Sequence, residues 1–392
     1  MSEMNPIENN LPPAVIGSKR PIRLAYVLAY RAPDYIRSQS LLRALDKCPG
    51  IELLVARNRS TGMLRYLETW RALRQLRKAH NLDVYLLGFR GHEMFWPVRW
   101  LIRGKPLVFD ALMSPSAALR EENNAGVLGR LLAPLVNRFE RGILQRANLV
   151  LTDTRQHALF YEAQFGLQKE NILAIPVGAV ETCVSSQTPT EAEIKQAPFS
   201  VLFYGSMLPL HGIDVIVAAA AQLTDVPIRF DFIGGKPRHA RQLHRLCAAH
   251  GVTRYTHRQW VPMSRLVEYE IPHANICLGG PFGDTPQAQR VITSKSSQGL
   301  ALGKATVIGS INEGYGFIDK YNCLLVPQAD ASALAAALRW SYENQGSLHA
   351  IGARGKRLYV EKLSIASIAS ALIPALQRLV DSNPTASRET VQ

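Results

Sequence analysis

The residues best placed to do chemistry lie in the second half of the chain, where glycine loops follow short apolar runs. In residues 203–223, FYGSMLPLHGIDVIVAAAAQL, one run ends at Gly205 and a helical pattern begins near Gly212. Further on, Gly234 and Gly235 close a second run in RFDFIGGKP. A strand, loop and helix in this order direct backbone N–H groups and the positive end of a helix dipole toward an anion. Each glycine alone indicates only a tight turn, but together they predict an anion site.

A positively charged helix start is predicted within residues 283–310, GDTPQAQRVITSKSSQGLALGKATVIGS. The backbone amides of Thr293, Ser294 and Lys295 would be free at the first turn of a short helix, where they can bind a diphosphate. The Lys295 ammonium adds a mobile positive charge. Gln298 follows one turn later, where its amide can hydrogen-bond to ribose hydroxyls. Together these residues predict a site for the diphosphate and ribose of a nucleotide.

The elements that must position these residues form an α/β pattern that runs twice along the chain. Apolar, β-branched runs alternate with amphipathic helical stretches, which is typical of parallel sheets covered by helices on both faces. The expected strands are 22–30, 51–57, 83–89, 106–109, 148–152 and 172–175 in the first series, and 200–204, 228–233, 275–278, 305–308 and 323–326 in the second. At 392 residues the chain has room for two domains of ordinary size. We predict an α/β fold with two Rossmann-like, doubly wound domains that face each other across a cleft.

The polar segment SSQTPTEAEIKQAP marks the boundary between the two series. With two prolines and no apolar period, it is typical of an interdomain linker. We therefore expect a first domain over 20–180, a linker over 181–198 and a second domain over 199–364. An apolar helical pattern over 365–381 is expected to cross back onto the first domain, and the polar tail 382–392 is expected to be disordered.

The second half resembles the retaining glycosyltransferases of family 4, which have the GT-B fold. That family has a strand with a Gly-Arg-x-x-x-x-Lys-Gly loop, then a strand that ends in Gly-Gly. A Glu, seven residues, Glu motif follows and leads into a helix of the type Glu-Ala-Met-Ala-x-Gly. In this chain Gly205 and Gly212 match the first motif, Gly234–Gly235 the second, and residues 298–303, QGLALG, the third. The similarity covers residues 200–344 well and the first half only in its general layout.

The chain departs from the family's pattern at the charged positions. The family's phosphate-binding Arg and Lys fall at Ser206 and His211, and its two glutamates fall at Arg290 and Gln298. A departing nucleoside diphosphate carries concentrated negative charge, which an active site must stabilise. We therefore predict that Arg290 and Lys295 replace the missing cations and act as catalytic residues.

In the first half, two side chains follow predicted strands and are expected to face the cleft. His92, in FRGHEMFW, follows the strand 83–89 at a position where the GT-B fold often has a histidine near the donor sugar, so we assign it to the catalytic group. Asp110 ends the run PLVFD and is assigned to the acceptor side. A structural role stays open for each residue. His92 can be a surface residue of a loop, and the carboxylate of Asp110 can cap the next segment.

The resemblance implies transfer of a sugar from a nucleoside-diphosphate donor to a saccharide or lipid-linked acceptor, with retention, in cell-surface polysaccharide or glycolipid synthesis. We expect no cofactor and no metal requirement, since acidic clusters that would bind a metal are missing from the sequence. Two alternatives stay open: a sugar-nucleotide epimerase or hydrolase on the same scaffold, and a binding or assembly subunit that has lost catalysis. A dehydrogenase is disfavoured because the first strand leads into RAPDYIRSQ and not into a GxGxxG turn.

The chain carries a net charge of +14, so its preferred partners are anionic. Residues 94–105, MFWPVRWLIRGK, interleave aromatic and basic side chains, a pattern that suits the headgroups of an anionic membrane. The side chains of this expected patch are Phe95, Trp96, Arg99, Trp100 and Arg103. A solvated helix surface over buried tryptophans explains the pattern equally well. Nucleic acid is a weaker candidate because no recognisable binding motif accompanies the charge.

The N-terminal residues MSEMNPIENN are acidic where a secretory signal would be basic and then apolar, so we expect a cytoplasmic protein. Peripheral binding to the inner face of the plasma membrane is the alternative that the patch at 94–105 leaves open. The longest apolar runs, such as 215–221, are far shorter than the ~20 residues that cross a bilayer, so no transmembrane helix is predicted.

Overall fold

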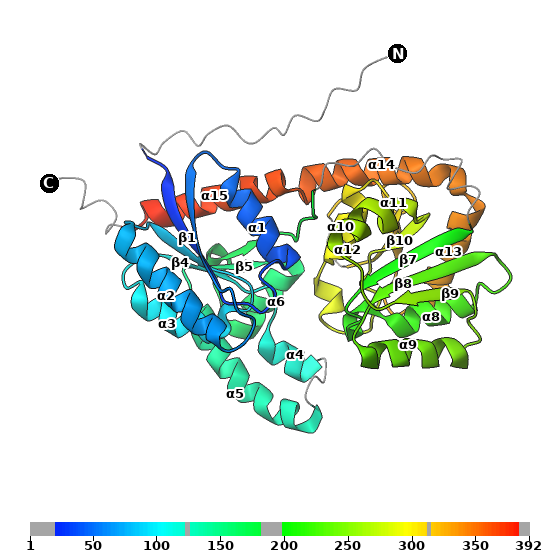
Figure 1. Ribbon diagram of the computed structural model, residues 1–392, viewed down its shortest axis with the longest axis horizontal. Coiled ribbons are helices and arrows are strands. Elements are labelled where there is room, and N and C mark those ends of the chain that lie inside the picture. Colours follow the sequence, from blue (N-terminus) through cyan, green and yellow to red (C-terminus); the bar gives the residue numbers. More distant parts are fainter. Residues whose placement is uncertain (1–19, 122–125, 182–197, 312–314, 384–392) are drawn as a thin grey trace, which may run out of the picture.

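Two parallel sheets organise the molecule, and helices cover both faces of each sheet (Figure 1). The computed structural model describes residues 20–121, 126–181, 198–311 and 315–383. Each sheet has six strands, all of them parallel. The predicted fold class, an α/β protein with two Rossmann-like domains, is therefore confirmed.

The first sheet and its helices take up the first half of the chain. In order they are β1 Ile22–Leu28, α1 Ile36–Asp46, β2 Ile51–Arg57, α2 Leu64–Ala79, β3 Val84–Leu87, η1 Gly91–Met94, α3 Phe95–Leu101, β4 Leu107–Asp110, α4 Pro115–Glu121, α5 Gly126–Leu144, β5 Leu149–Thr152, α6 Arg155–Phe165, η2 Lys169–Asn171 and β6 Ile172–Ala174. All the predicted strands of this series are present. Central strands such as β3 are buried along their whole length, because helices pack on both sides of them.

The second sheet begins after the predicted linker. Its elements are β7 Phe199–Gly205, η3 Pro209–His211, α8 Ile213–Ala221, β8 Ile228–Gly234, α9 Pro237–Ala249, β9 Tyr255–Arg258, α10 Met263–Arg265, η4 Leu266–Glu270, α11 Ile271–His273, β10 Ile276–Leu278, η5 Ala288–Arg290, α12 Ser294–Ala301, β11 Thr306–Gly309, β12 Leu324–Val326, α13 Ala331–Glu343, α14 Gln345–Lys362 and α15 Ile365–Asp381. The five strands predicted here are present. Strand β9, with the polar sequence YTHR, was not predicted; it lies at the edge of the sheet, where side chains face water.

The strand order fixes where each sheet can bind a ligand. The first sheet has the order β2-β1-β3-β4-β5-β6 and the second β12-β11-β10-β7-β8-β9. The winding therefore reverses between β1 and β3 in the first sheet and between β7 and β10 in the second. Open α/β sheets bind ligands beyond the carboxyl ends of their strands at such points.

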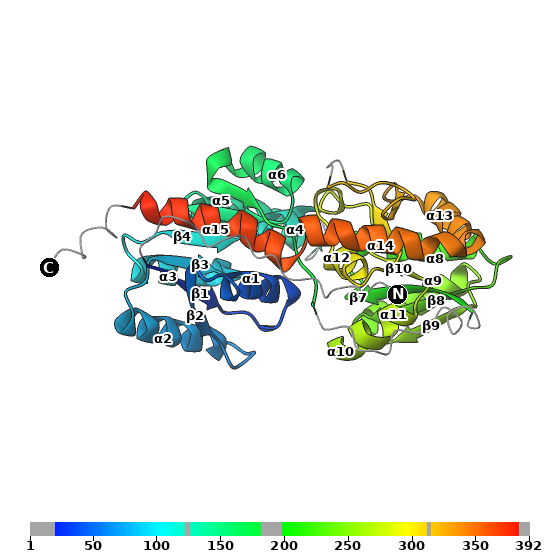
Figure 2. The ribbon, with the colours of Figure 1, turned by 90° about the horizontal axis from the view of Figure 1, so that it is seen from above.

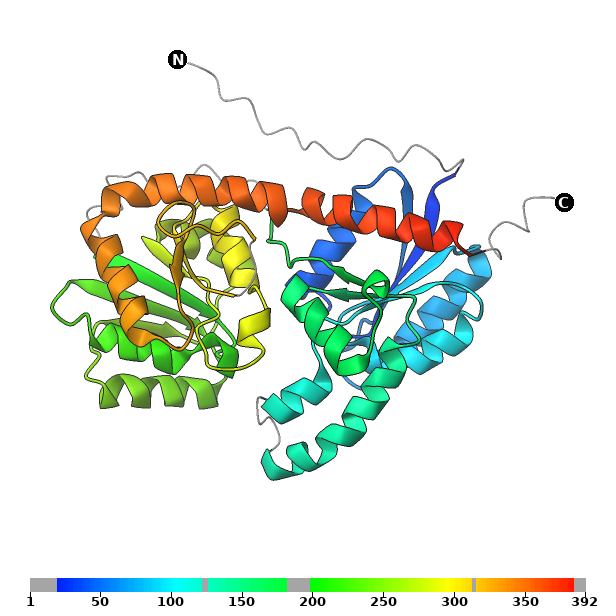
Figure 3. The same cartoon turned by 180° about the vertical axis from the view of Figure 1, so that it is seen from behind.

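The C-terminal helices connect the two domains. Helix α14 lies along the second domain and α15 continues across the first (Figures 2 and 3). Buried apolar residues of α15, such as Ile368, Leu372 and Leu376, share a core with α1 and β1. This confirms the predicted crossover helix. By length and apolarity alone, the stretch Gln345–Asp381 could cross a membrane, but half of its apolar window is buried within the protein, so internal packing accounts for it.

Two predicted segments lie largely outside the described residues. These are the linker 181–198 and the tail 382–392. The chain changes from one sheet to the other between β6 and β7. The domain limits given above stay predictions.

Candidate functional site

Two glycines lie side by side where β7 and β8 end. Gly205 pairs with Gly234 in the parallel register, and both have positive φ angles, 139° and 114°. A Cβ on Gly234 would lie 2.2 Å from the carbonyl oxygen of Gly205. A larger residue would force the strand ends apart, so the ends of β7 and β8 present backbone at this point.

The loop after β7 also depends on a glycine. Ser206 is exposed, and Gly212, with a φ of 63°, ends η3 and precedes α8. A Cβ on Gly212 would lie 2.5 Å from the backbone carbonyl carbon of Phe282 and 2.7 Å from the nitrogen of Gly283. The loop therefore packs directly on the backbone of the segment that follows β10.

Hydroxyl groups fix the first turn of α12 to the carboxyl end of β10. The Thr293 hydroxyl accepts a hydrogen bond from the backbone N–H of Ser296 and donates one to the carbonyl oxygen of Gly279 at 2.6 Å. The Ser296 hydroxyl donates to the carbonyl oxygen of Gly280 at 3.1 Å. Because β10 lies beside β7 in the sheet, the start of α12 lies next to Gly205.

Lys295, which follows Ser294 in the first turn of α12, extends toward Gly205. A Cβ on Gly205 would lie 3.7 Å from the Lys295 Nζ, and this Nζ is 5.6 Å from the centre of the Phe203 ring. Lys295 is 5% exposed, and burial lowers the pKa of its ammonium to about 7. No carboxylate of the described residues forms an ion pair with it. A buried ammonium without an anionic partner is costly, so this position suits an anionic ligand.

His211 lies beside the same glycine. A Cβ on Gly205 would be 3.7 Å from the Cε1 of His211. The backbone N–H of Leu208 donates to the Nδ1 of His211 at 3.1 Å, so the neutral ring carries its proton on Nε2. Burial, and then the charge of Lys295, lower the pKa of His211 well below its usual value. The ring is therefore neutral near pH 7 and has an Nε2–H donor for an anion.

Gln298 has a structural role that differs from the one predicted. Its Oε1 accepts a hydrogen bond from the backbone N–H of Val180 at 2.8 Å, and its Nε2 donates to the carbonyl oxygen of Val180 at 3.2 Å. The side chain is buried. Both ends of the amide hold the segment that leaves the first domain, so the predicted contact with ribose is corrected to a contact with the backbone.

Arg290 also has protein partners. Its guanidinium forms an ion pair with Glu121 at the end of α4 and lies 3.8 Å from the centre of the Phe160 ring. Its backbone carbonyl accepts a hydrogen bond from the Thr154 hydroxyl. All three partners belong to the first domain. We therefore reassign Arg290 from phosphate binding to contact between the domains.

His92 lies in η1, beyond the end of β3, and so at the winding reversal of the first sheet. Its ring is edge-on to Phe109, with 4.9 Å between the ring centres. Burial, and then the charge of Arg90, lower the pKa of His92 to about 3. Its Nε2 is buried and has no hydrogen-bond partner among the described residues. A buried polar atom of this kind indicates a place for a ligand or a water molecule.

An aromatic cluster that the sequence analysis did not identify lies at the same end of β1 and β3. Phe89 stacks on Tyr35 with ring centres 4.6 Å apart and lies edge-on to Tyr30 at 5.1 Å. Phe89 is buried, whereas the two tyrosines are half-buried. Half-buried tyrosines present a ring face and a hydroxyl, which suits a polar ligand. The signal available in the sequence was the place of Tyr30 and Phe89 at the ends of predicted strands.

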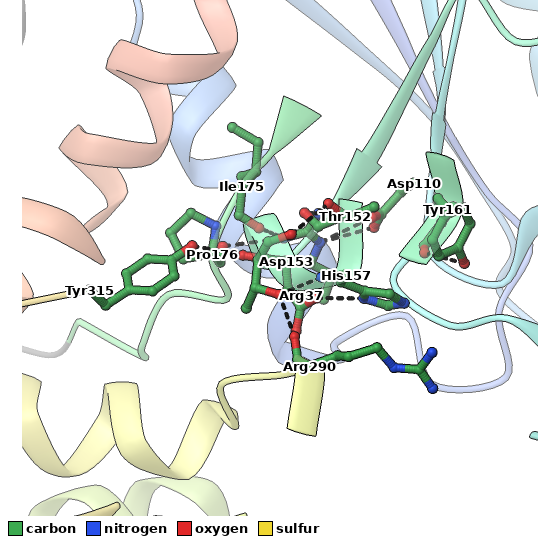
Figure 4. Close-up of polar contacts among 12 residues, drawn as sticks. Arg37, Asp110, Thr152, Asp153, His157, Tyr161, Ile175, Pro176, Arg290 and Tyr315 are labelled. Atoms are coloured by element: carbon green, nitrogen blue, oxygen red, sulfur yellow. Dashed lines mark hydrogen bonds and ion pairs between the residues drawn. The ribbon is translucent and has the colours of Figure 1, made fainter. Parts of the chain in front are cut away.

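Asp110 is fully buried in an ion pair with Arg37 (Figure 4). The Nε and Nη2 atoms of Arg37 donate to the Oδ1 of Asp110 at 3.0 and 2.9 Å. Nη1 of Arg37 donates to the carbonyl oxygens of Ile175 and Pro176. Asp110 thereby ties β4 to α1. The predicted role on the acceptor side is wrong, because both residues of the pair are 0% exposed.

The carboxyl edges of the two sheets meet near Asp153, just beyond β5 (Figure 4). Its carbonyl oxygen accepts a hydrogen bond from the hydroxyl of Tyr315, in the second domain, at 3.2 Å. Its carboxylate contacts the Nδ1 of His157 at 2.6 Å, and the next residue, Thr154, donates to the carbonyl of Arg290. The strand ends that carry Gly205 and those of the first sheet therefore lie on the facing sides of the two domains.

The predicted membrane patch is only partly at the surface. Phe95 is fully buried in the core of the first domain, so its assignment to the patch is wrong. Trp96 and Trp100 are 40% and 61% exposed, which contradicts the alternative of buried tryptophans. Arg103 stacks on Trp100 at 5.3 Å, and Arg99 donates to a backbone carbonyl in the turn after α3. Contact of these residues with a membrane stays a prediction.

Within the part of the chain that the structure describes, no group of three or more His, Cys, Asp or Glu side chains is arranged to hold a metal ion. A diphosphate bound beside Gly205 would contact the ammonium of Lys295 and the imidazole of His211. The expectation that no cofactor or metal is needed stays a prediction.

Comparisons with known proteins bear on the fold. No family model matches the chain, and no curated protein matches its sequence. Sucrose-phosphate synthase from Thermosynechococcus elongatus matches with a TM-score of 0.70 at 15% identity, over 93% of this chain and 100% of that chain. Anabaena HepE in complex with UDP-glucose matches with a TM-score of 0.65 at 14% identity, over 91% and 100%. The N-terminal domain of Candida albicans trehalose-6-phosphate phosphatase matches with a TM-score of 0.63 at 9% identity, over 92% and 97%.

Identities this low establish the architecture and leave the reaction open. One neighbour is named a synthase and another a phosphatase, and a single fold supports many chemistries. What the neighbours share with this chain is the arrangement of two Rossmann-like domains over almost its whole length. The chain therefore has the GT-B fold, in common with sucrose-phosphate synthase and HepE.

Proposed function

We propose that the protein is a glycosyltransferase that moves a sugar from a nucleoside-diphosphate donor to a hydroxyl of a saccharide or lipid-linked acceptor, in cell-surface polysaccharide or glycolipid synthesis. The observation that carries the proposal is the buried ammonium of Lys295 beside Gly205, where no carboxylate of the described residues pairs with it. This position is the winding reversal of the second sheet. HepE was solved with UDP-glucose, so a uridine nucleotide is the first donor to test.

In this proposal the donor's diphosphate contacts the first turn of α12. The N–H groups of Ser294 and Lys295 lie at the positive end of that helix. The Lys295 ammonium and the Nε2–H of His211 add one charged and one neutral donor. Negative charge builds up on the leaving diphosphate as the bond to the sugar breaks, so these groups stabilise the transition state more than the bound substrate.

The acceptor is assigned to the first domain, near Tyr30, Tyr35 and His92. These residues lie at the winding reversal of the first sheet, and the contact of Tyr315 with Asp153 supports a position opposite the donor. A histidine with a pKa of about 3 is a weak base. We therefore assign to His92 a hydrogen bond with a sugar hydroxyl. The leaving phosphate, and not His92, then accepts the proton of the acceptor's hydroxyl.

Replacing Lys295 with methionine tests the diphosphate site. Burial lowers the ammonium's pKa from 10.5 to about 7. Removing the charge should therefore stabilise the ligand-free protein by an amount on the order of a few kcal/mol, at ~1.4 kcal/mol per pKa unit. The same substitution should abolish the rise in unfolding temperature that UDP, GDP or ADP gives the parent protein. Thermal unfolding with and without each nucleotide measures both effects.

Lys304→Met is the matched control. Lys304 is a second lysine of the same domain whose pKa is lowered by burial, and its Nζ donates to the carbonyl oxygen of Pro272 at 3.0 Å. It precedes β11 and so lies at the opposite edge of the sheet from Gly205. This variant should keep the response to nucleotide. A Lys295→Met protein that responds as the parent does would refute the assignment.

A binding or assembly subunit without catalysis is the second candidate. It is favoured by Ser206, which stands where related enzymes have an arginine, and by the pairing of Arg290 with Glu121. Incubation of the parent protein with UDP-glucose, with and without a panel of acceptors, separates the possibilities. Donor consumption only with an acceptor indicates a transferase, and consumption of the donor alone indicates a hydrolase or epimerase. Nucleotide binding without consumption indicates the subunit.

A further inference from the structure

Helix α5 exposes a row of large apolar side chains along most of its length. The row consists of Val127, Leu128, Leu131, Leu132, Leu135 and Phe139, which are between 45% and 75% exposed. Their spacing puts five of them, from Leu128 on, on one face of the helix. Figures 1 and 3 show α5 at the side of the first domain away from α15, with one end projecting beyond the sheet. Contiguous exposed apolar residues of this kind mark an interaction surface.

The opposite face of α5 is anchored in the protein. Glu140 accepts hydrogen bonds from the Ser114 hydroxyl at 3.0 Å and from the backbone N–H of Ser116 at 3.1 Å. Ala133 and Ile143 are buried on the same side. The helix is therefore held by one face while the apolar row points away from the domain.

Basic side chains lie beside the apolar row. Arg130, Arg138 and Arg141 are exposed, and Glu140, the only carboxylate of α5, is buried. A helix with an exposed apolar row, flanking arginines and no exposed carboxylate has the charge complementary to an anionic lipid surface. A two-fold contact between copies of this chain would instead bring the arginines of both helices together, without carboxylates from α5 to pair with them.

Exposed tryptophans of α3 lie near the C-terminal end of α5. Arg146, just beyond the end of α5, lies 5.3 Å from the centre of the exposed Trp96 ring. Trp100, one turn further along α3, is also exposed. The two tryptophans therefore lie near the C-terminal end of α5.

We propose that α5 binds the surface of an anionic lipid bilayer, with the helix parallel to the membrane plane. The apolar row enters the boundary between headgroups and acyl chains, and the arginines contact headgroup phosphates. With 19 residues, the helix is about 28 Å long at 1.5 Å per residue, so it can contact several lipids at once. The surface is separate from the proposed nucleotide site, and the proposal does not depend on the reaction.

Flotation of the full-length protein with lipid vesicles tests the proposal. We expect it to bind vesicles of phosphatidylcholine mixed with phosphatidylglycerol, to bind pure phosphatidylcholine far less, and to bind less at high salt. The variant Leu128→Ser/Leu131→Ser/Leu135→Ser should bind the anionic vesicles at least tenfold more weakly. Since the replaced side chains are exposed, its unfolding temperature should match that of the parent.

The matched control removes an equal number of exposed apolar side chains from the start of α2, with the variant Met63→Ser/Leu64→Ser/Leu67→Ser. This variant should bind as the parent does. Equal losses in both variants, or a parent protein that does not bind anionic vesicles, would overturn the proposal. Sedimentation gives a further check: a parent dimer that the α5 substitutions dissociate, without vesicle binding, would assign the surface to a second copy of the chain.

Discussion

The proposed donor site depends on a lysine whose protonation changes near neutral pH. In the unfolded chain Lys295 has its ordinary pKa of 10.5, and burial lowers this pKa to about 7 in the folded protein. Between these pH values the unfolded state binds more protons than the folded state, so the contribution of Lys295 to stability rises with pH. Binding of a diphosphate has the opposite dependence, because it requires the ammonium.

We therefore expect the affinity for a nucleoside diphosphate to fall as pH rises above about 7, by up to about tenfold per pH unit. The variant Lys295→Arg keeps its charge over this range. It should bind more weakly than the parent at acidic pH, because the guanidinium is larger, and should lose most of the pH dependence. Titration calorimetry below and above pH 7 measures the nucleotide affinity of each protein and its dependence on pH. A parent affinity that does not change with pH would contradict the assignment of Lys295.

Whether the contacts of a site residue could be predicted from the sequence depended on how far away in the chain its partners lie. The proximity of Lys295 to a glycine strand end follows from motif order, since strands and loops of one domain meet at one edge. The partners of Gln298 and Arg290 are Val180 and Glu121, which are 118 and 169 residues away in sequence. The spacing of these residues in the sequence gives no indication that they form such pairs. They form only because the two domains come into contact.

At the level of elements, the orientation of α12 depends on its N-cap. The variant Thr293→Val keeps the shape of the side chain and removes its hydrogen bonds to Ser296 and Gly279. We expect the free energy of unfolding to fall by about 1–3 kcal/mol, because a helix cap is lost and a buried carbonyl loses its partner. Nucleotide affinity should fall as well, because the first turn is no longer fixed beside Gly205.

Thr293→Ser is the conservative control, because it retains the hydroxyl. Urea unfolding and nucleotide titration of the two variants separate a general loss of stability from a displaced binding site. If Thr293→Val bound nucleotide as tightly as Thr293→Ser, the start of α12 would not hold the diphosphate.

Elements differed in how clearly the sequence predicted them. Strands buried on both faces, such as β3 with the sequence VYLL, are continuous apolar runs and were predicted. The polar edge strand β9 was not. The sequence pattern of α5 predicts a helix with an apolar face. Whether that face is buried depends on which other segments of the fold pack against it. In this fold α4 contacts one side of α5, where Glu140 accepts a hydrogen bond from the backbone N–H of Ser116, and the leucine row stays exposed.

At the level of the whole molecule, two groups of contacts between the described parts of the domains bear on how the domains can move, beside the contact of Gln298 with Val180. Helix α15 carries the C-terminal end of the chain onto the first sheet (Figure 3). The second connection lies between the carboxyl edges of the sheets, where Arg290 pairs with Glu121 and contacts Phe160. Tyr315 also donates there to the carbonyl of Asp153. In the proposed reaction the substrates enter between these edges, so we expect the second connection to loosen during turnover, whereas the α15 core can stay intact.

The charge reversal Glu121→Arg should therefore open the protein without unfolding either domain. The side chains of Arg290 and Glu121 are 14% and 12% exposed, and breaking a buried pair by changing one partner costs about 3–5 kcal/mol, enough to favour separated edges. Small-angle X-ray scattering should show a larger radius of gyration for this variant. Adding Arg290→Glu restores opposite charges and should recover most of the compaction. If Glu121→Arg left the scattering curve unchanged, the pair would not hold the domains together, and the closed arrangement would rest on α15 and the other contacts between the edges.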